Sequence, residues 1–224
     1  MHAHRAFLAS TIVAIAALSG CGGGSSTSPN PGFKDPRDGQ TYDLVKIGTQ
    51  TWFAENLDYK GTGSDTVGVC SEFLTANCDL YGRLYTWAEA MQGATSSGAT
   101  PSGVQGVCPS GWHLPSSDEL TTLDTYASGL QGAFNLASGL MSNSSAWGAY
   151  AGSNSTGFNG LPAGYLLASP FTFANSGGYA WWWSSTLDGS TGEVDNLGIQ
   201  GLDRSIHLNE DFPANAHSVR CIAN

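Results

Sequence analysis

The positions of four cysteines constrain the fold of this chain more than any other feature of its sequence. They are Cys70, Cys78, Cys108 and Cys221. Four cysteines permit three pairings, of which we favour Cys70–Cys78, which closes a short loop, and Cys108–Cys221, which joins the middle of the chain to its C-terminal end. A zinc site is the alternative, but the four lack Cys-x-x-Cys spacing and a nearby histidine pair. We therefore expect a domain that is cross-linked by two disulfides.

The N-terminus predicts export, which places these cysteines in an oxidising compartment. His2, His4 and Arg5 precede an apolar run over residues 6–18. This run is too short to cross a bilayer, which requires about 20 residues. A charged start, a short apolar segment and small residues at the cleavage site are typical of a secretory signal. Disulfides form and persist in the compartments that such signals lead to.

The residues at the end of the apolar run predict a lipid anchor. Residues 18–21 read Leu-Ser-Gly-Cys, which resembles a bacterial lipobox. The resemblance implies a signal peptide over residues 1–20, acylation of Cys21 and attachment to a membrane through the lipid. Gly22 follows in place of an acidic retention signal and favours the outer membrane and the cell surface. The alternative is an ordinary secreted protein.

The segment after Cys21 predicts a tether. Residues 22–31 read GGGSSTSPNP, a flexible Gly/Ser stretch that continues into proline-containing sequence. It has no apolar side chains to bury, so we expect a disordered spacer over residues 21–32. The remaining residues, 33–224, fall within the size of one domain.

Composition excludes several classes of partner. The chain has a formal net charge of −10, and only 12% of its residues are charged. Nucleic-acid binding requires a basic patch, so neither nucleic acids nor anionic lipid head groups are expected partners. Seven Trp, eight Tyr and nine Phe supply a core.

The hydrophobic pattern predicts an α+β domain with short antiparallel strands, two or three flanking helices and long loops. Ser116 and Glu119 have the spacing of a capping box at a helix start, and Leu120, Leu123 and Tyr126 form the expected buried stripe. Other helices are predicted over 81–92 and 133–141, and a loop over 58–79. Strands are predicted over residues 41–48, 50–57, 161–166, 179–184, 193–199, 205–208 and 218–222.

Blocks of sequence along the chain resemble one family, the Fibrobacter succinogenes major paralogous domain. They cover nearly all of the chain after the tether. The resemblance implies a bacterial surface protein, often behind a lipoprotein signal, whose biochemical role is unassigned. The blocks are Asp38–Tyr42, Thr51–Leu57, Tyr81–Trp87, Cys108–Pro115, Leu161–Tyr165, Trp182–Ser185 and Ser218–Cys221.

A more distant likeness suggests the architecture. Residues 112–120, followed much later by aromatic strands and Val219-Arg220-Cys221, are similar to formylglycine-generating enzymes and other C-type-lectin-like domains. The likeness implies that N- and C-terminal strands pair, that two helices flank the sheet, and that a loop-rich region carries ligands. A Cys108–Cys221 bridge suits this closed-loop architecture.

The sequence does not favour an enzyme. His113, His207 and His217 form no metal-binding or nucleophile motif. Formylglycine-generating enzymes use a cysteine pair near the C-terminus, whereas only Cys221 lies there in this chain. A divergent enzyme is the alternative, and it requires carboxylates that converge. The candidates are Glu193, Asp195 and Asp203.

One oxygen-rich segment is a candidate for a structural calcium ion, although we expect no cofactor. Hard cations require several oxygen ligands. The spacing does not match an EF-hand, and the Glu-Pro-Asn and Trp-Asn-Asp signatures of C-type lectins are missing. The candidate ligands are Asp188, Ser190, Thr191, Glu193, Asp195 and Asn196.

A run of three tryptophans suggests a contact surface. In a strand, Trp182 points to one face, and Trp181 and Trp183 point to the other. We predict that Trp181 is a contact residue, together with Asp188, Glu193, Asp195, Asn196 and Asp203. We therefore expect a surface-anchored, non-catalytic module that binds a glycan or a protein; the alternative is a structural or adhesion component of the envelope.

Overall fold

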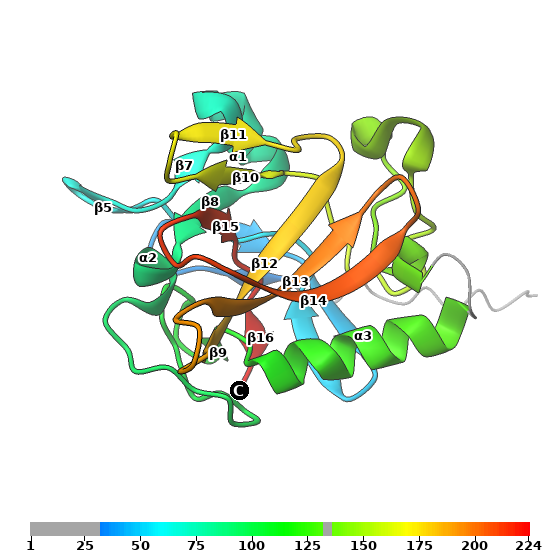
Figure 1. Ribbon diagram of the computed structural model, residues 1–224. Helices are drawn as coiled ribbons and strands as arrows, with labels where there is room; N and C mark the ends of the chain where they lie inside the picture. Colours follow the sequence, from blue (N-terminus) through cyan, green and yellow to red (C-terminus); the bar gives the residue numbers. More distant parts are fainter. Residues whose placement is uncertain (1–31, 132–135) are drawn as a thin grey trace, which may run out of the picture.

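The computed structural model describes residues 32–131 and 136–224, which form a mixed α+β structure made mostly of strands (Figure 1). The predicted signal peptide, Cys21 and the tether up to residue 31 lie outside these residues. Within them are an eight-stranded sheet, a four-stranded sheet, two small strand pairs and three α-helices. The coarse prediction of an α+β domain with flanking helices is confirmed.

The four-stranded sheet joins the beginning of the domain to its end. Its order is β3 (Leu44–Ile47), β4 (Gln50–Phe53), β16 (Ile222–Ala223) and β9 (Trp112–His113). All neighbours are antiparallel, and Ile222 of β16 lies opposite Trp52 of β4. The predicted β3–β4 hairpin is therefore confirmed, and the last strand lies beside it.

The eight-stranded sheet carries the other strands of the C-terminal half. Three of its strands, β12 (Tyr179–Leu187), β13 (Val194–Gln200) and β14 (Ser205–Asp211), form an antiparallel meander. Ala216–Ser218, strand β15, lies between this meander and the remaining strands. Those strands are β10 (Tyr165–Leu167), β11 (Thr172–Ala174), β8 (Arg83–Thr86) and β7 (Val69–Cys70).

Short elements complete the described chain. Two small hairpins pair β1 with β2 and β5 with β6. They are β1 (Phe33–Lys34), β2 (Thr41–Tyr42), β5 (Gly61–Thr62) and β6 (Asp65–Thr66). The helices are α1 (Thr75–Tyr81), α2 (Trp87–Met91), α3 (Ser117–Gln131) and the 3₁₀ turns η1 (Ser71–Phe73), η2 (Leu136–Gly139) and η3 (Ser145–Tyr150). No helix in this part of the chain is both long enough and apolar enough to span a bilayer.

Helix α3 begins as its sequence predicts. The Glu119 backbone N–H donates to Ser116 Oγ at 3.2 Å, and the Ser116 N–H donates to Glu119 Oε2 at 2.9 Å. Leu120 and Leu123 are buried as expected. Tyr126 is 43% exposed, which corrects the predicted stripe. Ala127 is buried in its place, because it lies one turn beyond Leu123 on the inner face.

The predicted helix over residues 81–92 is wrong in its first half. Residues 83–86 form strand β8, and the helix α2 begins only at Trp87. Strand β8 pairs with β15, more than a hundred residues later, and this pairing overrides the local helical spacing. Helix α1 also lies in the predicted loop over 58–79. Of the predicted helix over 133–141, residues 136–139 form a 3₁₀ turn and residues 133–135 lie outside the described chain.

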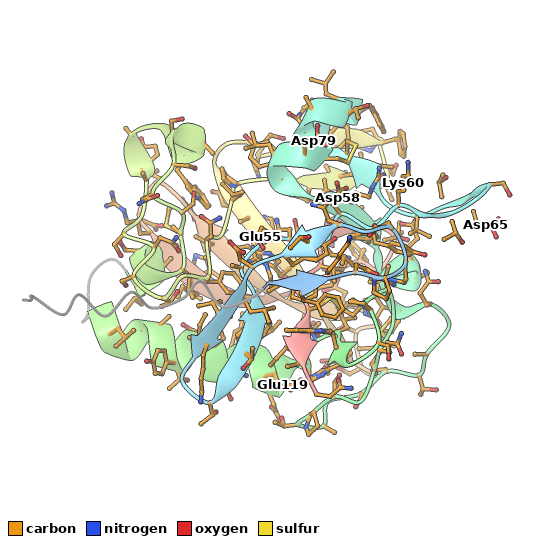
Figure 2. The ribbon with its side chains drawn as sticks, turned by 180° about the vertical axis from the view of Figure 1, so that it is seen from behind. Glu55, Asp58, Lys60, Asp65, Asp79 and Glu119 are labelled. Carbon is orange, nitrogen blue, oxygen red and sulfur yellow. A yellow bond between two sulfur atoms is a disulfide. The ribbon has the colours of Figure 1, made fainter. Side chains whose placement is uncertain are left out.

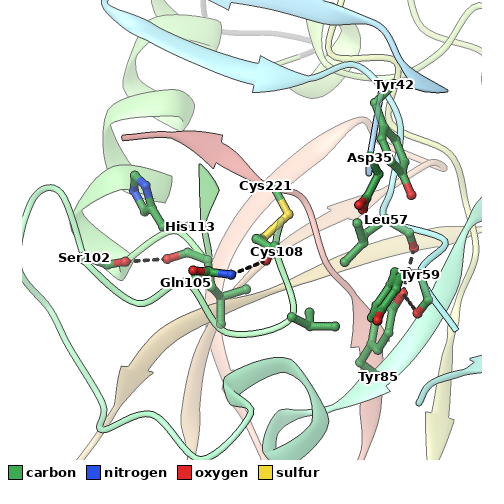
Figure 3. Close-up of a disulfide and its surroundings, with 12 residues drawn as sticks. Asp35, Tyr42, Leu57, Tyr59, Tyr85, Ser102, Gln105, Cys108, His113 and Cys221 are labelled. Atoms are coloured by element: carbon green, nitrogen blue, oxygen red, sulfur yellow. Dashed lines mark hydrogen bonds between the residues drawn. A yellow bond between two sulfur atoms is a disulfide. The ribbon is translucent and has the colours of Figure 1, made fainter. Parts of the chain in front are cut away.

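Both predicted disulfides are present. Cys70 is bonded to Cys78, and Cys108 is bonded to Cys221. The second bridge joins the loop before β9 to the residue before β16, and both of its cysteines are buried in the core (Figure 3). Beside it, the Gln105 side chain donates to the Cys108 carbonyl at 3.2 Å. The bridge therefore cross-links the segments that lead into β9 and β16, two neighbouring strands of the four-stranded sheet.

Candidate functional site

A pocket of about 220 Å³ lies on the face of the eight-stranded sheet that is turned away from α3. Alternation along β13 separates the faces: Leu197 and Ile199 pack in one cluster with Leu120 of α3, whereas Asn196 points to the opposite side. We call this cavity the β12 pocket. It is lined by Tyr165, Trp181, Asn196, Asn209, Glu210, Asp211 and His217.

Strand register positions the Trp181 ring in the β12 pocket. Trp181 lies opposite Gly198 of β13, and a Cβ atom on that glycine would come 2.1 Å from the indole. Only glycine leaves space for the ring at this position. The ring stacks nearly parallel to Tyr179, with centroids 6.1 Å apart, and meets Tyr165 edge-on at 6.3 Å. The indole is therefore held among other rings rather than free to rotate.

A histidine–aspartate pair forms a polar wall of the pocket. His217 Nε2 lies 2.7 Å from Asp211 Oδ2, and Asn215 donates to the other Asp211 oxygen at 2.8 Å. Burial alone would raise the pKa of Asp211, but these hydrogen bonds outweigh it and hold that pKa below its usual value. Burial also lowers the pKa of His217. At neutral pH the pair is therefore a carboxylate and a neutral imidazole that donates from Nε2.

Lining residues of the β12 pocket carry hydrogen-bonding capacity that the protein does not use. The indole N–H of Trp181, Oδ1 of Asn196 and Nδ1 of His217 are buried without a hydrogen-bond partner. The side chains of Asn196 and His217 are almost fully buried. A buried polar atom that stays unpaired costs roughly 1–3 kcal/mol, so such atoms are rare in a native structure. Three such atoms belong to residues that line one cavity, which makes it the candidate binding site of the described residues.

The buried imidazole gives the fold a pH dependence. We expect the free energy of unfolding to fall as the pH is lowered through 6.5, because unfolded His217 takes up a proton near that value while folded His217 resists it. The loss is at most about 1.4 kcal/mol at about pH 5.5. Urea unfolding at about pH 7.5 and pH 5.5 measures it. In His217→Gln the free energy of unfolding should fall less between these two pH values, by up to this amount. An equal fall in the wild type and in His217→Gln would contradict the assignment of the pH dependence to His217.

The structure brings together two of the predicted contact residues, Trp181 and Asn196. Asp195 points to the other face, where it lines a hollow with Ser117 of α3. Glu193 precedes β13 and Asp203 follows it, so the length of a seven-residue strand separates them. The carboxylates of Glu193, Asp195 and Asp203 therefore do not converge.

The segment proposed for calcium is not arranged around an ion. Asp188 Oδ1 accepts hydrogen bonds from the Ser190 N–H and hydroxyl at 2.6 Å and from the Thr191 N–H. These bonds, the Ser190 hydroxyl first, lower the pKa of Asp188. Asp195 and Asn196 face opposite sides of the sheet. No cluster of three His, Cys, Asp or Glu side chains suited to a metal occurs in residues 32–131 and 136–224.

Sequence reasoning missed most of the residues that line the β12 pocket. Asn209 and Asp211 were detectable, because polar residues alternate along β14 at positions 205, 207, 209 and 211. Tyr165 and His217 carried no such signal. They reach the pocket because β15 lies between β10 and β12, which is a property of the sheet order.

Another hollow, acidic and of about 170 Å³, lies on another side of the molecule, lined in part by Glu55, Asp58 and Asp79 (Figure 2). Burial raises the pKa of Glu55 and Asp58. Asp58 is ion-paired to Arg83 at 3.1 Å, which offsets that effect. This pairing leaves the acidic hollow a weaker candidate than the β12 pocket.

Comparison with known proteins identifies a family model that matches most of the chain. The family model for the Fibrobacter succinogenes major domain matches residues 45–223, which include all the residues of the β12 pocket. No curated protein and no solved structure matches the chain significantly.

Proposed function

The chain belongs to the Fibrobacter succinogenes major domain family, and we propose that it is a non-catalytic module that binds a neutral glycan in the β12 pocket. We argue this from the pocket because the family carries no assigned reaction. The observation that carries this proposal is the Trp181 ring beside the unpaired polar atoms of Asn196 and His217. The module is held at the outer membrane through lipidated Cys21, facing the cell surface.

Sugar chemistry fits this combination of groups. A pyranose ring has an apolar face of C–H groups and an edge of hydroxyls that both donate and accept hydrogen bonds. The face packs on an indole, which combines a large apolar surface with a donor N–H. The hydroxyls complement the Trp181 donor and the acceptors on Asn196 and His217. Small pockets reach specificity through a few such polar groups beside an aromatic surface.

Charge favours a neutral ligand over an acidic one. Asp211 and Glu210 line the pocket, and the whole chain has a net charge of −10. A uronic acid or a sulfated sugar would be repelled by both.

The architecture supports a binding role by analogy, and the C-type-lectin-like fold is part of the proposal. Its support is the pairing of β4 with β16, which joins the N- and C-terminal parts of the domain, and the α3 helix against the larger sheet. Fold analogy alone does not assign a ligand.

A non-catalytic role is supported by two carboxylates that the sequence suggested for catalysis and by Asp211. Asp211 is engaged by His217 and Asn215, and Glu193 and Asp203 lie at opposite ends of β13. A glycosidase requires two carboxyl groups on either side of one bond, about 5–9.5 Å apart. A divergent enzyme is therefore the less favoured function.

An exposed aromatic cluster favours a second candidate, contact with another envelope protein. Phe73 is 57% exposed and Phe171 is 61% exposed, and their rings stack at 5.7 Å. Leu74, 58% exposed, extends this surface. Apolar side chains grouped in this way on a surface are typical of interaction sites.

A binding screen tests the glycan proposal. The chain without its predicted signal peptide, carrying Cys21→Ser, is produced in an oxidising compartment and tested on immobilised neutral glucans, xylans and mannans and on anionic pectin and alginate. We expect saturable binding to a neutral polysaccharide that Trp181→Ala weakens about tenfold or more, since about 1.4 kcal/mol of lost ring contact has that effect.

Phe171→Ala is the matched control, because it removes an exposed aromatic ring outside the β12 pocket. It should leave glycan binding unchanged. Absence of binding by a folded, disulfide-bonded protein, or unaltered binding by Trp181→Ala, would overturn the proposal. Loss of a protein contact in Phe171→Ala would support the second candidate.

A further inference from the structure

We infer that the β12 pocket is one of two adjoining subsites, and that the ligand is a neutral glycan of at least two rings that extends along β12 into a second hollow. This inference rests on the proposed function. It adds a second binding site and a minimum ligand length.

The second subsite is a hollow of about 480 Å³ beside η3, which we call the η3 hollow. It lies where η3, the start of β12 and the turn after β13 meet. Its lining includes Trp147, Gly148, Tyr150, Tyr179, Gln200 and Leu202.

Tyr179 and Trp181 connect the two cavities. Tyr179 lines the η3 hollow, and Trp181 lines the β12 pocket. They are alternate residues of one strand and pair with Gln200 and Gly198, so both point to the same face of the sheet. Their rings are nearly parallel, at an angle of 5°. The two rings therefore place one aromatic contact in each cavity, side by side along one face of β12.

The two cavities set the minimum ligand length. They share no lining residue, and the Tyr179 and Trp181 rings that connect them have centroids 6.1 Å apart. A ligand that fills both cavities therefore extends beyond one sugar ring and has at least two.

The chemistry of the η3 hollow favours an uncharged ligand. None of the residues that line it is Asp, Glu, Lys, Arg or His. Tyr150 is 40% exposed and Leu202 is 64% exposed, so both present apolar surface to an incoming ligand. Gln200 and the tyrosine hydroxyls supply neutral hydrogen-bonding groups. An apolar rim with neutral polar groups matches a sugar and disfavours an ionic ligand.

Glycine keeps the hollow open. Gly148 has φ of 57°, which L side chains rarely adopt, and a Cβ atom at this position would meet no atom within 4 Å. The space above this turn is therefore free, and backbone groups of η3 are accessible from it.

Oligosaccharide length is the test. The polysaccharide that binds in the screen above is hydrolysed to a series of one to about six rings, and the dissociation constant of each is measured by calorimetry on the same protein. We expect affinity to rise about tenfold between one ring and the length that reaches the η3 hollow, and then to level off. Tyr150→Ala should reduce the affinity of the long oligosaccharides to that of the short ones, and leave the short ones unchanged.

Tyr126→Ala is the matched control, because Tyr126 is 43% exposed on α3, away from both subsites. Leu202→Ala is a second test variant, and its 64% exposure means that it should not affect folding. Affinity that is independent of length, with Trp181→Ala still defective, would overturn this inference and leave the proposed function intact. Equal weakening of short and long ligands by Tyr150→Ala would also overturn it. Absence of binding at any length would overturn both.

Discussion

Removal of the Cys108–Cys221 disulfide is expected to reduce the free energy of unfolding by about 4–5 kcal/mol. The bridge closes a loop with a sequence separation of 113 residues. In the chain-entropy description, a cross-link of that span restricts the unfolded chain by about this amount. A typical domain is stable by only about 5–15 kcal/mol, so the loss is a large fraction of the total.

The Cys70–Cys78 disulfide provides an internal control for this prediction. Its sequence separation is 8, for which the same relation gives about 2.5 kcal/mol. Urea unfolding of Cys108→Ala/Cys221→Ala and of Cys70→Ala/Cys78→Ala should differ accordingly. Equal losses in the two variants would show that loop length does not govern the stabilisation. If the first variant does not fold, unfolding of Cys70→Ala/Cys78→Ala with and without reductant isolates the contribution of Cys108–Cys221.

Arg220→Met is expected to destabilise the domain by roughly 3–5 kcal/mol. Arg220 is fully buried, and burial lowers its pKa to about 9 against the opposing effect of the Glu55 carboxylate. Its guanidinium donates to the side chain of Asn56 and to the carbonyls of Phe53 and Phe158. Methionine removes these donors from the core, and truncating one partner of a buried polar network has a cost of this size.

This arginine organises residues that are far apart in the sequence. Asn56 Oδ1 also accepts from the Trp182 indole at 2.7 Å, and the Asn56 amide donates to the Tyr81 carbonyl at 2.8 Å. The guanidinium lies 4.2 Å from the centroid of the Phe158 ring. Loss of Arg220 therefore removes a contact common to both sheets and to the loop that carries Phe158.

Chemical denaturation of Arg220→Met, Arg220→Lys and Lys46→Met measures the effect. Lys46 is exposed on β3, so its substitution should change stability by no more than about 0.5 kcal/mol. Lysine at 220 keeps the charge but loses the planar fork that reaches several acceptors, so it should rescue little. Wild-type stability in Arg220→Met would refute the role assigned to this side chain.

Local signals in the sequence predicted the elements whose causes are local. The β3–β4 hairpin depends on apolar spacing around Gly48, whose φ of 60° suits a turn. The start of α3 depends on Ser116 and Glu119, three residues apart. The two disulfides followed from loop closure and chain position.

Elements with distant causes were not predictable in the same way. Residues 83–86 have helical spacing but form β8, because β15 offers them a strand to pair with. The contact prediction for Trp181 used strand alternation, which is local, and the structure places Trp181 in the pocket. Asp188, Glu193 and Asp203 appeared near it in the sequence but lie in turns at the two ends of β13.

The sequence by itself determined the family, the α+β class, the capped helix and the alternation of the three tryptophans, because each depends on residue identity, order or short-range spacing. Among three possible cysteine pairings it only favoured the one that the structure shows. Only the tertiary structure decided where the candidate site lies. Tyr165, Asn196 and His217 meet at Trp181 because sheet order brings β10, β13 and β15 beside β12. Sheet order is set by which pairings bury the most apolar surface across the whole domain, and no local stretch of sequence encodes that sum.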